Sequence, residues 1–313
     1  MNMLTPSNAN TVILEKQHFN VLALDGGGTK GVYTLGVLKE LEAHLQKPLY
    51  QHFDLIYGTS TGSIIASLLA LGKTVTEIEA IYFQTIPQIM AQTSRAKRSK
   101  EIRLLATNFF KQAKFDAFKT HIGIVTTHDE YHSPVIFRTQ ANISTEYAFD
   151  STIADAVVAS CAAYPFFEAS QIKSVQGASL TLLDGGMVAN NPSLLAITDA
   201  IRLANTTRNK IRVLSVGVGH YPIPKYVWYK EIGIKLIKKR LGKKRPTNNS
   251  QIVETIRKML YPNIAYIRID DTFKDAQYAT SMLDNKLSKL KAIHQLGRIS
   301  FEKYKPSILD LFS

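Results

Sequence analysis

The sequence has one cysteine, Cys161, and no long apolar run accompanies its motifs. A single thiol excludes an intramolecular disulfide and is typical of proteins from reducing compartments. The longest apolar stretch beside a motif, residues 63–71, is far shorter than the roughly 20 residues that a membrane-spanning helix needs. Residues 1–20 lack the basic start and the apolar block of a secretory signal. These absences lead us to expect a cytosolic protein.

Acidic residues are scarce relative to basic ones. The 313 residues include 25 Asp and Glu against 38 Lys and Arg, which gives a formal net charge of +13. This surplus favours a polyanionic partner, such as nucleic acid, an anionic membrane surface or a phosphorylated small molecule, although a solvated basic surface has the same composition. The stretch "KLIKKRLGKKR" at 235–245 holds seven of the basic residues. It is typical of an interfacial helix for anionic lipid, of a phosphate-binding patch, or of a solvated helix packed on the core.

Strand and helix patterns alternate over the first part of the chain. Apolar runs predict strands at 21–24 and 53–57, and each is followed by a helical pattern, at 31–45 and 61–71. This alternation is typical of an α/β fold with a parallel sheet covered by helices. Further strands are predicted at 122–126, 135–139, 179–183 and 212–216, and helices at 153–161 and 190–204.

The chain contains no internal repeat and no clear linker, which predicts a single domain. We expect an N-terminal extension at 1–18, a catalytic core at 19–220, and a mainly helical, basic C-terminal part at 221–313 that belongs to the same domain. Residues 94–120 are basic and weakly periodic, which is typical of an inserted cap or of a solvated helix pair.

The stretch "VLALDGGGTKG" places glycines between a strand and a helix. Gly26, Gly28 and Gly31 fit the spacing of a dinucleotide-binding loop. Two features argue against that interpretation. Asp25 would face a pyrophosphate with its own negative charge, and the second strand ends in "YGTSTG" where an acidic residue is expected.

The second motif, "GTSTG" at 58–62, follows a predicted strand and opens a predicted helix. This is the context of a nucleophile elbow, in which a strained turn holds Ser60 clear of the backbone. A serine that attacks an ester generates an oxyanion, and the glycines of the first motif could offer backbone N–H groups to it. A plain turn that caps a helix is the simpler alternative.

The base that would activate Ser60 is open at this point. The order of α/β-hydrolase triads favours Ser60, Asp184 and His220, whereas Asp184 lies before flexible glycines and could approach Ser60 itself. Two other candidates are weak. "HDEYH" at 128–132 resembles a zinc motif, but Asp129 stands where Glu is required and Pro134 disfavours a helix. Cys161 lies among small residues and is typical of a packed core thiol.

Four blocks in the same order resemble the patatin-like phospholipase family over roughly residues 19–220. They are "DGGGTKG" (25–31), "GTSTG" (58–62), "ASCAAYPFF" (159–167) and "DGGMVANNP" (184–192). The resemblance implies a three-layer α/β/α fold with a mainly parallel central sheet, and a phospholipase that cleaves acyl esters without a cofactor or metal. It also implies a Ser60–Asp184 dyad and an oxyanion hole formed by Gly26, Gly27 and Gly28. The family usually has Arg where this sequence has Lys30, and a lysine keeps the charge of a candidate anion-binding residue without the bidentate fork.

The resemblance also bears on partners. It implies peripheral contact with a phospholipid membrane surface at its inner, cytoplasmic face, and no nucleic-acid partner. Small bacterial members of the family include effectors of antiviral defence that a cyclic oligonucleotide activates, and the length of this chain fits them. We therefore consider a cyclic oligonucleotide activator and a homo-oligomer. The alternative from another class is an anion- or nucleotide-binding regulatory module without hydrolase activity, and the intact Ser60, Asp184 and glycines argue against it.

Overall fold

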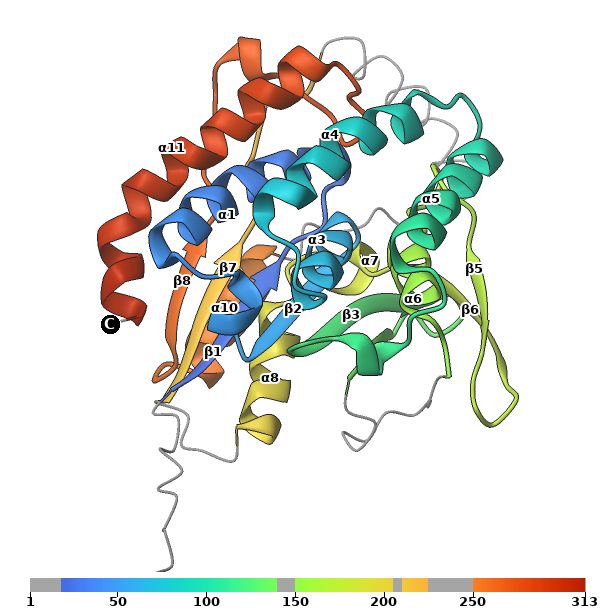
Figure 1. Ribbon diagram of the computed structural model, residues 1–313, viewed down its shortest axis with the longest axis horizontal. Coiled ribbons are helices and arrows are strands. Elements are labelled where there is room, and N and C mark those ends of the chain that lie inside the picture. The colour runs from blue at the N-terminus through green and yellow to red at the C-terminus, as the bar shows by residue number, and fades with distance from the viewer. Residues whose placement is uncertain (1–17, 140–149, 205–209, 225–249, 313) are drawn as a thin grey trace, which may run out of the picture.

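The computed structural model describes residues 18–139, 150–204, 210–224 and 250–312, and shows a sheet flanked by helices (Figure 1). All of its strands join one eight-stranded sheet. They are β1 (Phe19–Leu24), β2 (Leu55–Thr59), β3 (His121–His128), β4 (Pro134–Arg138), β5 (Ser170–Lys173), β6 (Ser179–Asp184), β7 (Ile211–Val216) and β8 (Ala265–Ile269).

The centre of the sheet is parallel. Its strand order is β5-β6-β3-β2-β1-β7-β8, and β4 pairs with β3 outside this path. β3, β2, β1, β7 and β8 run parallel to one another, whereas β4 and β6 pair antiparallel with β3, and β5 pairs antiparallel with β6. The prediction of a mainly parallel α/β sheet is therefore confirmed. Because β1 and β2 are parallel neighbours, the loops that follow them meet at the same edge of the sheet.

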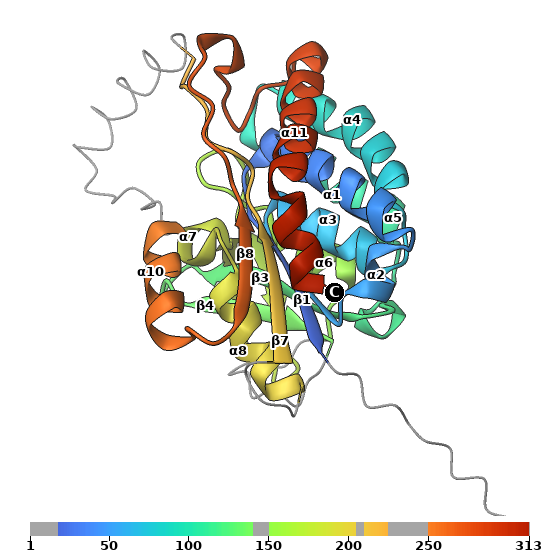
Figure 2. The same ribbon diagram turned by 90° about the vertical axis from the view of Figure 1, so that its left-hand side faces the viewer.

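Helices cover both faces of the sheet, which confirms the predicted three layers (Figure 2). Alternate residues of β1 face opposite layers, with Leu22 and Leu24 in one apolar core and Val21 and Ala23 in the other. The first face carries α1 (Gly31–Leu45), α3 (Thr61–Ala70), α4 (Val75–Ala91), α5 (Arg95–Phe110), α6 (Ile153–Ser160) and α11 (Leu287–Phe312), beside the short α2 (Leu49–His52). The second carries α7 (Gly186–Ala189) and α8 (Ser193–Leu203), with α10 (Ser250–Leu260) next to α8.

The C-terminal part adds more than helices. Its stretch "AYIRI" forms β8, which extends the sheet in parallel beside β7. Within the predicted cap at 94–120, α5 begins after Ser94, whose side chain accepts a hydrogen bond from the N–H of Lys97. α5 buries Ile102 and Phe110 against the core. The domain bounds and the cap stay predictions. The basic stretch 235–245 and the extension at 1–17 lie outside the described residues.

Two further observations concern elements that were doubtful from the sequence. Residues 129–133 form the turn between β3 and β4, so His128 and His132 do not lie on a helix as the zinc motif requires. None of the helices among the described residues combines the length and the apolar composition that a bilayer-crossing helix requires.

Candidate active site

Ser60 occupies a sharp turn between β2 and α3. Its backbone has φ 53° and ψ −123°, a conformation that non-glycine residues rarely adopt. The turn brings the strand and helix very close to β1, because a Cβ at Gly62 would lie 2.3 Å from the carbonyl oxygen of Leu24. This is the geometry of a nucleophile elbow, and it places Ser60 at the positive N-terminal end of α3.

The hydroxyl of Ser60 donates a 2.5 Å hydrogen bond to Oδ2 of Asp184. The other carboxylate oxygen of Asp184 accepts a 2.6 Å bond from the N–H of Gly186. The register of the sheet explains the encounter: Thr59 of β2 is level with Val125 of β3, and the next residue of β3 pairs with Asp184 at the end of β6. The carboxylate of Asp184 therefore meets the hydroxyl of Ser60 directly, without an intervening side chain.

Burial raises the pKa of Asp184 to about 6, although its hydrogen bonds with Ser60 and Gly186 oppose this rise. A carboxylate with such a pKa accepts a proton more readily than an ordinary aspartate at neutral pH. Cys161 is also buried nearby, and burial together with the negative charge of Asp184 raises its thiol pKa far above the usual range. It is therefore a packed thiol and not an activated nucleophile.

The glycine loop after β1 lies against Ser60, because a Cβ at Gly26 would be 3.1 Å from that of Ser60. The N–H of Gly26 donates to the carbonyl oxygen of Asn190 at 3.1 Å, so it is not free for an oxyanion. Within the described residues, the N–H groups of Gly27 and Gly28 donate to no protein acceptor. This narrows the predicted oxyanion hole from three N–H donors to these two. Gly26, which lacks a side chain, allows the loop to lie close to Ser60. Their role in catalysis stays a prediction.

Contacts from distant elements fix the loop. The hydroxyl of Tyr82, on α4, donates to the carbonyl oxygen of Gly28 at 2.6 Å and lies 2.5 Å from the hydroxyl of Thr61. Thr29 is held on the other side, where its N–H donates to the carbonyl oxygen of Met282 at 3.1 Å and its hydroxyl to that of Ser281 at 3.2 Å. Segments from α4 and from the C-terminal part thus set the shape of the loop.

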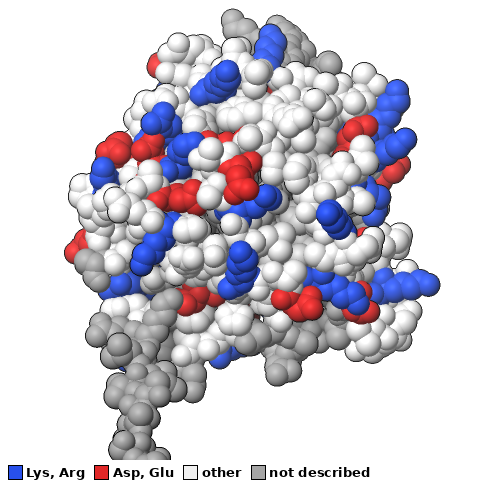
Figure 3. Space-filling model, viewed as in Figure 1, with Lys and Arg blue, Asp and Glu red and all other residues white. Residues whose placement is uncertain are grey.

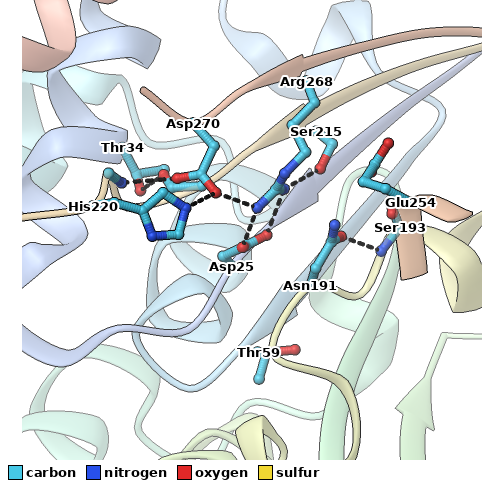
Figure 4. A network of polar contacts seen from close by, with 12 residues as sticks. Asp25, Thr34, Thr59, Asn191, Ser193, Ser215, His220, Glu254, Arg268 and Asp270 are labelled. Carbon is cyan, nitrogen blue, oxygen red and sulfur yellow. Dashed lines mark hydrogen bonds and ion pairs between the residues drawn. The ribbon is translucent and has the colours of Figure 1, made fainter. Parts of the chain in front are cut away.

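A network of charged side chains surrounds Asp25, the residue directly before the glycine loop (Figure 4). Arg268, on β8, donates from Nη1 to Oδ1 of Asp25 at 3.0 Å and from Nη2 to Oδ2 at 2.7 Å. The same guanidinium donates to Ser215 and to Asp270, both at 2.7 Å. His220 closes the network at the surface, where its Nε2 lies 3.1 Å from Oδ2 of Asp270. The network therefore joins the residue before Gly26 to the ends of β7 and β8.

Neither of the two remaining candidates contacts the dyad: His220 belongs to this network, and Lys30 lies near enough to Asp270 and Asp25 to feel their charge. His220 is exposed, and its hydrogen bond with Asp270 raises its pKa. Lys30 is half-buried; burial lowers its pKa, against the attraction of Asp270 and Asp25. Its predicted role as an anion-binding residue stays a prediction. Among the described residues, no group of three or more His, Cys, Asp or Glu is arranged to hold a metal ion.

Comparison with known proteins places this geometry in a family. Residues 22–197 match the family described as patatin-like phospholipase. The chain belongs to this family. It is 43% identical over 306 residues to an Escherichia coli protein named cUMP-AMP-activated phospholipase, and the aligned region covers 95% of each chain. It is 27% identical over 234 residues to a Vibrio cholerae protein named cGAMP-activated phospholipase, and that aligned region covers 64% of each chain.

Solved structures share the patatin-like fold at low sequence identity. VipD from Legionella pneumophila superposes with a TM-score of 0.53 at 12% identity, over 93% of this chain and 67% of that protein. The human GIVD cytosolic phospholipase A2 gives 0.51 at 10% identity, over 95% of this chain and 60% of that one. At these identities the comparison supports the fold alone.

Sequence reasoning missed several residues of this patatin-like site. Tyr82 carries no motif, and nothing local connects it with Gly28. Arg268 did carry a signal, because an arginine inside the apolar strand "AYIRI" needs a buried acidic partner. Asp25, directly after the buried strand β1, needs a basic partner for the same reason, but neither stretch indicates which residue that partner is.

Proposed function

We propose that this protein is a serine phospholipase that hydrolyses acyl esters of membrane phospholipids with a Ser60–Asp184 dyad. The observation that carries the proposal is the 2.5 Å hydrogen bond from the Ser60 hydroxyl to Asp184, at an elbow that lies against the glycine loop. Intact catalytic groups and membership in the patatin-like phospholipase family favour an enzyme over a regulatory module without activity.

In the first half-reaction, the Ser60 oxygen attacks the ester carbonyl carbon while Asp184 takes the hydroxyl proton. The carbonyl oxygen becomes an oxyanion, which the N–H groups of Gly27 and Gly28 and the N-terminus of α3 stabilise. The intermediate collapses, the bond to the alcohol breaks, and Asp184 returns the proton to the departing lysophospholipid oxygen. Ser60 is left as an acyl ester.

In the second half-reaction, water attacks the acyl-serine carbonyl while Asp184 takes a proton from the water. A second oxyanion forms in the same hole, the bond to the Ser60 oxygen breaks, and Asp184 returns the proton to Ser60. The free fatty acid leaves and the enzyme is regenerated. No histidine takes part in either half-reaction.

A cavity beside the dyad suits the acyl chain. It measures about 290 Å³, close to the lower end of the range for small-molecule sites, and lies between α5 and the end of α6. Buried Ile102, Val158 and Phe167 form its apolar wall, and Arg103 stands at its exposed side. Its wall continues into Ala162, whose carbonyl accepts a 3.1 Å hydrogen bond from the N–H of Asp184. An acyl chain in this cavity would start next to the dyad.

Charge supports contact with an anionic lipid surface. On the face shown in Figure 3, which carries α4, α5 and α11, basic and acidic side chains are interspersed. Residues 225–249, in contrast, hold nine Lys or Arg and one Glu, so this segment accounts for +8 of the net +13. A cluster of this composition is attracted to anionic headgroups. We place the protein in the cytoplasm, in peripheral contact with the inner face of the membrane.

Regulation by a cyclic nucleotide is part of the proposal. The Escherichia coli relative that matches along 95% of both chains is named for activation by cUMP-AMP. An activator that binds an active state more tightly than an inactive one shifts the population toward activity. We expect low basal turnover that rises when such a ligand binds, and we keep a homo-oligomer as the form in which this happens.

The test is fatty-acid release from phospholipid vesicles by the wild type and by Ser60→Ala, each alone and with cUMP-AMP or cGAMP. We expect release by the wild type that increases with one of the two ligands, and none by Ser60→Ala. Full activity of the ligand-free protein would contradict the gating. A ligand that shifts the melting temperature without any release would favour the regulatory module.

A further inference from the structure

The glycine loop is tied to the C-terminal part by a buried two-point ion pair. The Asp25 side chain is 3% exposed and that of Arg268 is 12% exposed. Both guanidinium contacts are short, at 3.0 and 2.7 Å, and the Asp25 N–H also donates to the carbonyl oxygen of Val216 at 3.1 Å. Asp25 is therefore fixed by both its side chain and its backbone. The glycine loop begins at the peptide bond between Asp25 and Gly26.

The negative charge of Asp25 lies next to the glycine loop, and Arg268 neutralises it. A carboxylate directly before the glycine loop would oppose an oxyanion that forms beside that loop. Burial disfavours the ionised Asp25 and raises its pKa to about 6, while Arg268 opposes this rise. The other charged groups that face Asp25 are Asp270, His220 and Lys30. They come from the segment after β8, the segment after β7 and the glycine loop. Only Arg268 contacts its carboxylate among the described residues.

The family match ends at residue 197, and several groups that bind the glycine loop or the residue before it come later in the chain. Arg268 comes from β8, and the carbonyl groups of Ser281 and Met282 bind Thr29 at the far end of the loop. Residues after the family region therefore bind both ends of the loop, at Asp25 and at Thr29. The Arg268 network ends at His220, which is exposed to solvent.

We propose that Arg268 is a positioning residue for the oxyanion loop: by pairing with Asp25 it neutralises the charge behind the loop and holds Gly27 and Gly28 in register with Ser60. The C-terminal part then takes part in catalysis through this contact, although it contributes no group to the dyad. This inference rests on the proposed hydrolase function for its kinetic readout, but the order of the loop can be measured without any substrate.

The protein offers a matched control in a second buried ion pair. Arg138 donates from Nε to Asp199 at 2.5 Å and from Nη2 at 3.3 Å, and these side chains are 13% and 2% exposed. This pair connects β4 with α8, where Tyr57 also bonds to Asp199. It has the same charges as the Asp25–Arg268 pair and nearly the same burial, but among the described residues it forms no hydrogen bond or ion pair with the glycine loop.

The kinetic experiment compares Arg268→Lys, Arg268→Met and Asp25→Asn/Arg268→Met with Arg138→Met/Asp199→Asn, on a soluble ester and per folded molecule. For Arg268→Lys we expect kcat to fall about 10- to 100-fold with KM within about threefold, less than the loss of an oxyanion donor. Arg268→Met should lose further activity as pH rises and Asp25 ionises without a partner. The double variant at Asp25 and Arg268 should lack this alkaline loss, and the Arg138/Asp199 control should keep the wild-type kcat and pH profile.

The second experiment is hydrogen exchange of the amides at residues 25–31, measured without substrate. We expect Arg268→Lys to speed this exchange at least about tenfold, and the Arg138/Asp199 control to leave it unchanged. Unchanged exchange and kcat in Arg268→Lys would overturn the proposal, and so would an equal loss in the control, since that would indicate general destabilisation. If the wild type hydrolysed no ester, the proposed function would fail, and the exchange experiment would still decide the role of Arg268.

Discussion

The hydroxyl of Ser60 donates directly to the carboxylate of Asp184 at 2.5 Å, while His220 pairs with Asp270 at the surface. This pairing predicts a dyad. Asp184→Asn should be nearly as inactive as Ser60→Ala, because members of one catalytic unit are not additive. His220→Ala should retain most of the turnover of a soluble ester, measured as kcat per folded molecule. An inactive but folded His220→Ala would show that the triad order was the correct interpretation.

The ionisation of Asp184 predicts the acid limb of activity. As a base it must be ionised, so kcat should fall as pH drops through about 6, with the loss of one ionisation. A histidine base has a reference pKa of about 6.5, so the pH profile alone does not separate the two bases. The profile of His220→Ala does, because the same acid limb should remain when the imidazole is gone.

The same carboxylate predicts a gain in stability when it is neutralised. Its folded-state pKa of about 6 lies above the unfolded value of 3.8, so the folded state binds more protons between these values and loses stability as pH rises through them. The difference corresponds to about 3 kcal/mol at most. Asp184→Asn should therefore raise the free energy of unfolding at pH 8, and the gain should vanish near pH 4. Asp129→Asn, at an exposed turn, is the control for the substitution itself, and an equal gain there would contradict the role of burial at Asp184.

Gly28 is expected to tolerate no side chain. Its φ is +61°, and a Cβ there would lie 2.4 Å from the carbonyl oxygen of Met282. Gly28→Ala should displace the loop and lower kcat on the order of 10²-fold, as the loss of an oxyanion donor does. Gly177→Ala is a matched control, since that glycine also has a positive φ, of 88°, but nothing lies within 4 Å of its Cβ position. Equal kinetic effects of the two variants would contradict the role of the loop.

The cavity between α5 and α6 predicts a change in chain-length preference. Ala96 lines it and is exposed, so Ala96→Trp can narrow the entrance without disturbing the core. Hydrolysis of a p-nitrophenyl ester of a long fatty acid should fall at least about tenfold relative to that of a butyrate ester. Leu104→Trp, at a 51% exposed position of the same helix, should leave the ratio unchanged. An equal loss of hydrolysis for both esters would show that the cavity does not bind the acyl chain.

The basic segment predicts salt-dependent membrane binding. Replacement of Lys238, Lys239, Lys243 and Lys244 with Gln should weaken binding to anionic vesicles by up to about 1 kcal/mol per charge. Hydrolysis of a soluble ester should persist, and binding to neutral phosphatidylcholine vesicles should not change. If the variant sedimented with anionic vesicles at low salt as the wild type does, this segment would not contribute to membrane binding.

The sequence by itself determined the local parts of this protein. The alternation of apolar runs and helical patterns predicts the parallel strands, since burial of one face or both leaves a short-range signal in the chain. "GTSTG" predicts the elbow for a similar reason: the glycines are required where strand and helix nearly touch, and this need is visible within five residues. The family resemblance added the dyad, which the residues alone had left open between Asp184 and His220.

Only the tertiary structure decided which distant groups meet. Asp184 reaches Ser60 because the register across β2, β3 and β6 brings residues 124 positions apart to the same level of the sheet. Tyr82 meets Gly28, and Arg268 meets Asp25, through packing between elements whose separate sequences carry no record of their partner. Register and packing are properties of the whole assembled core, because each strand pairing depends on the neighbours that bury it, and so the contacts that shape the oxyanion loop appear only once the chain is folded.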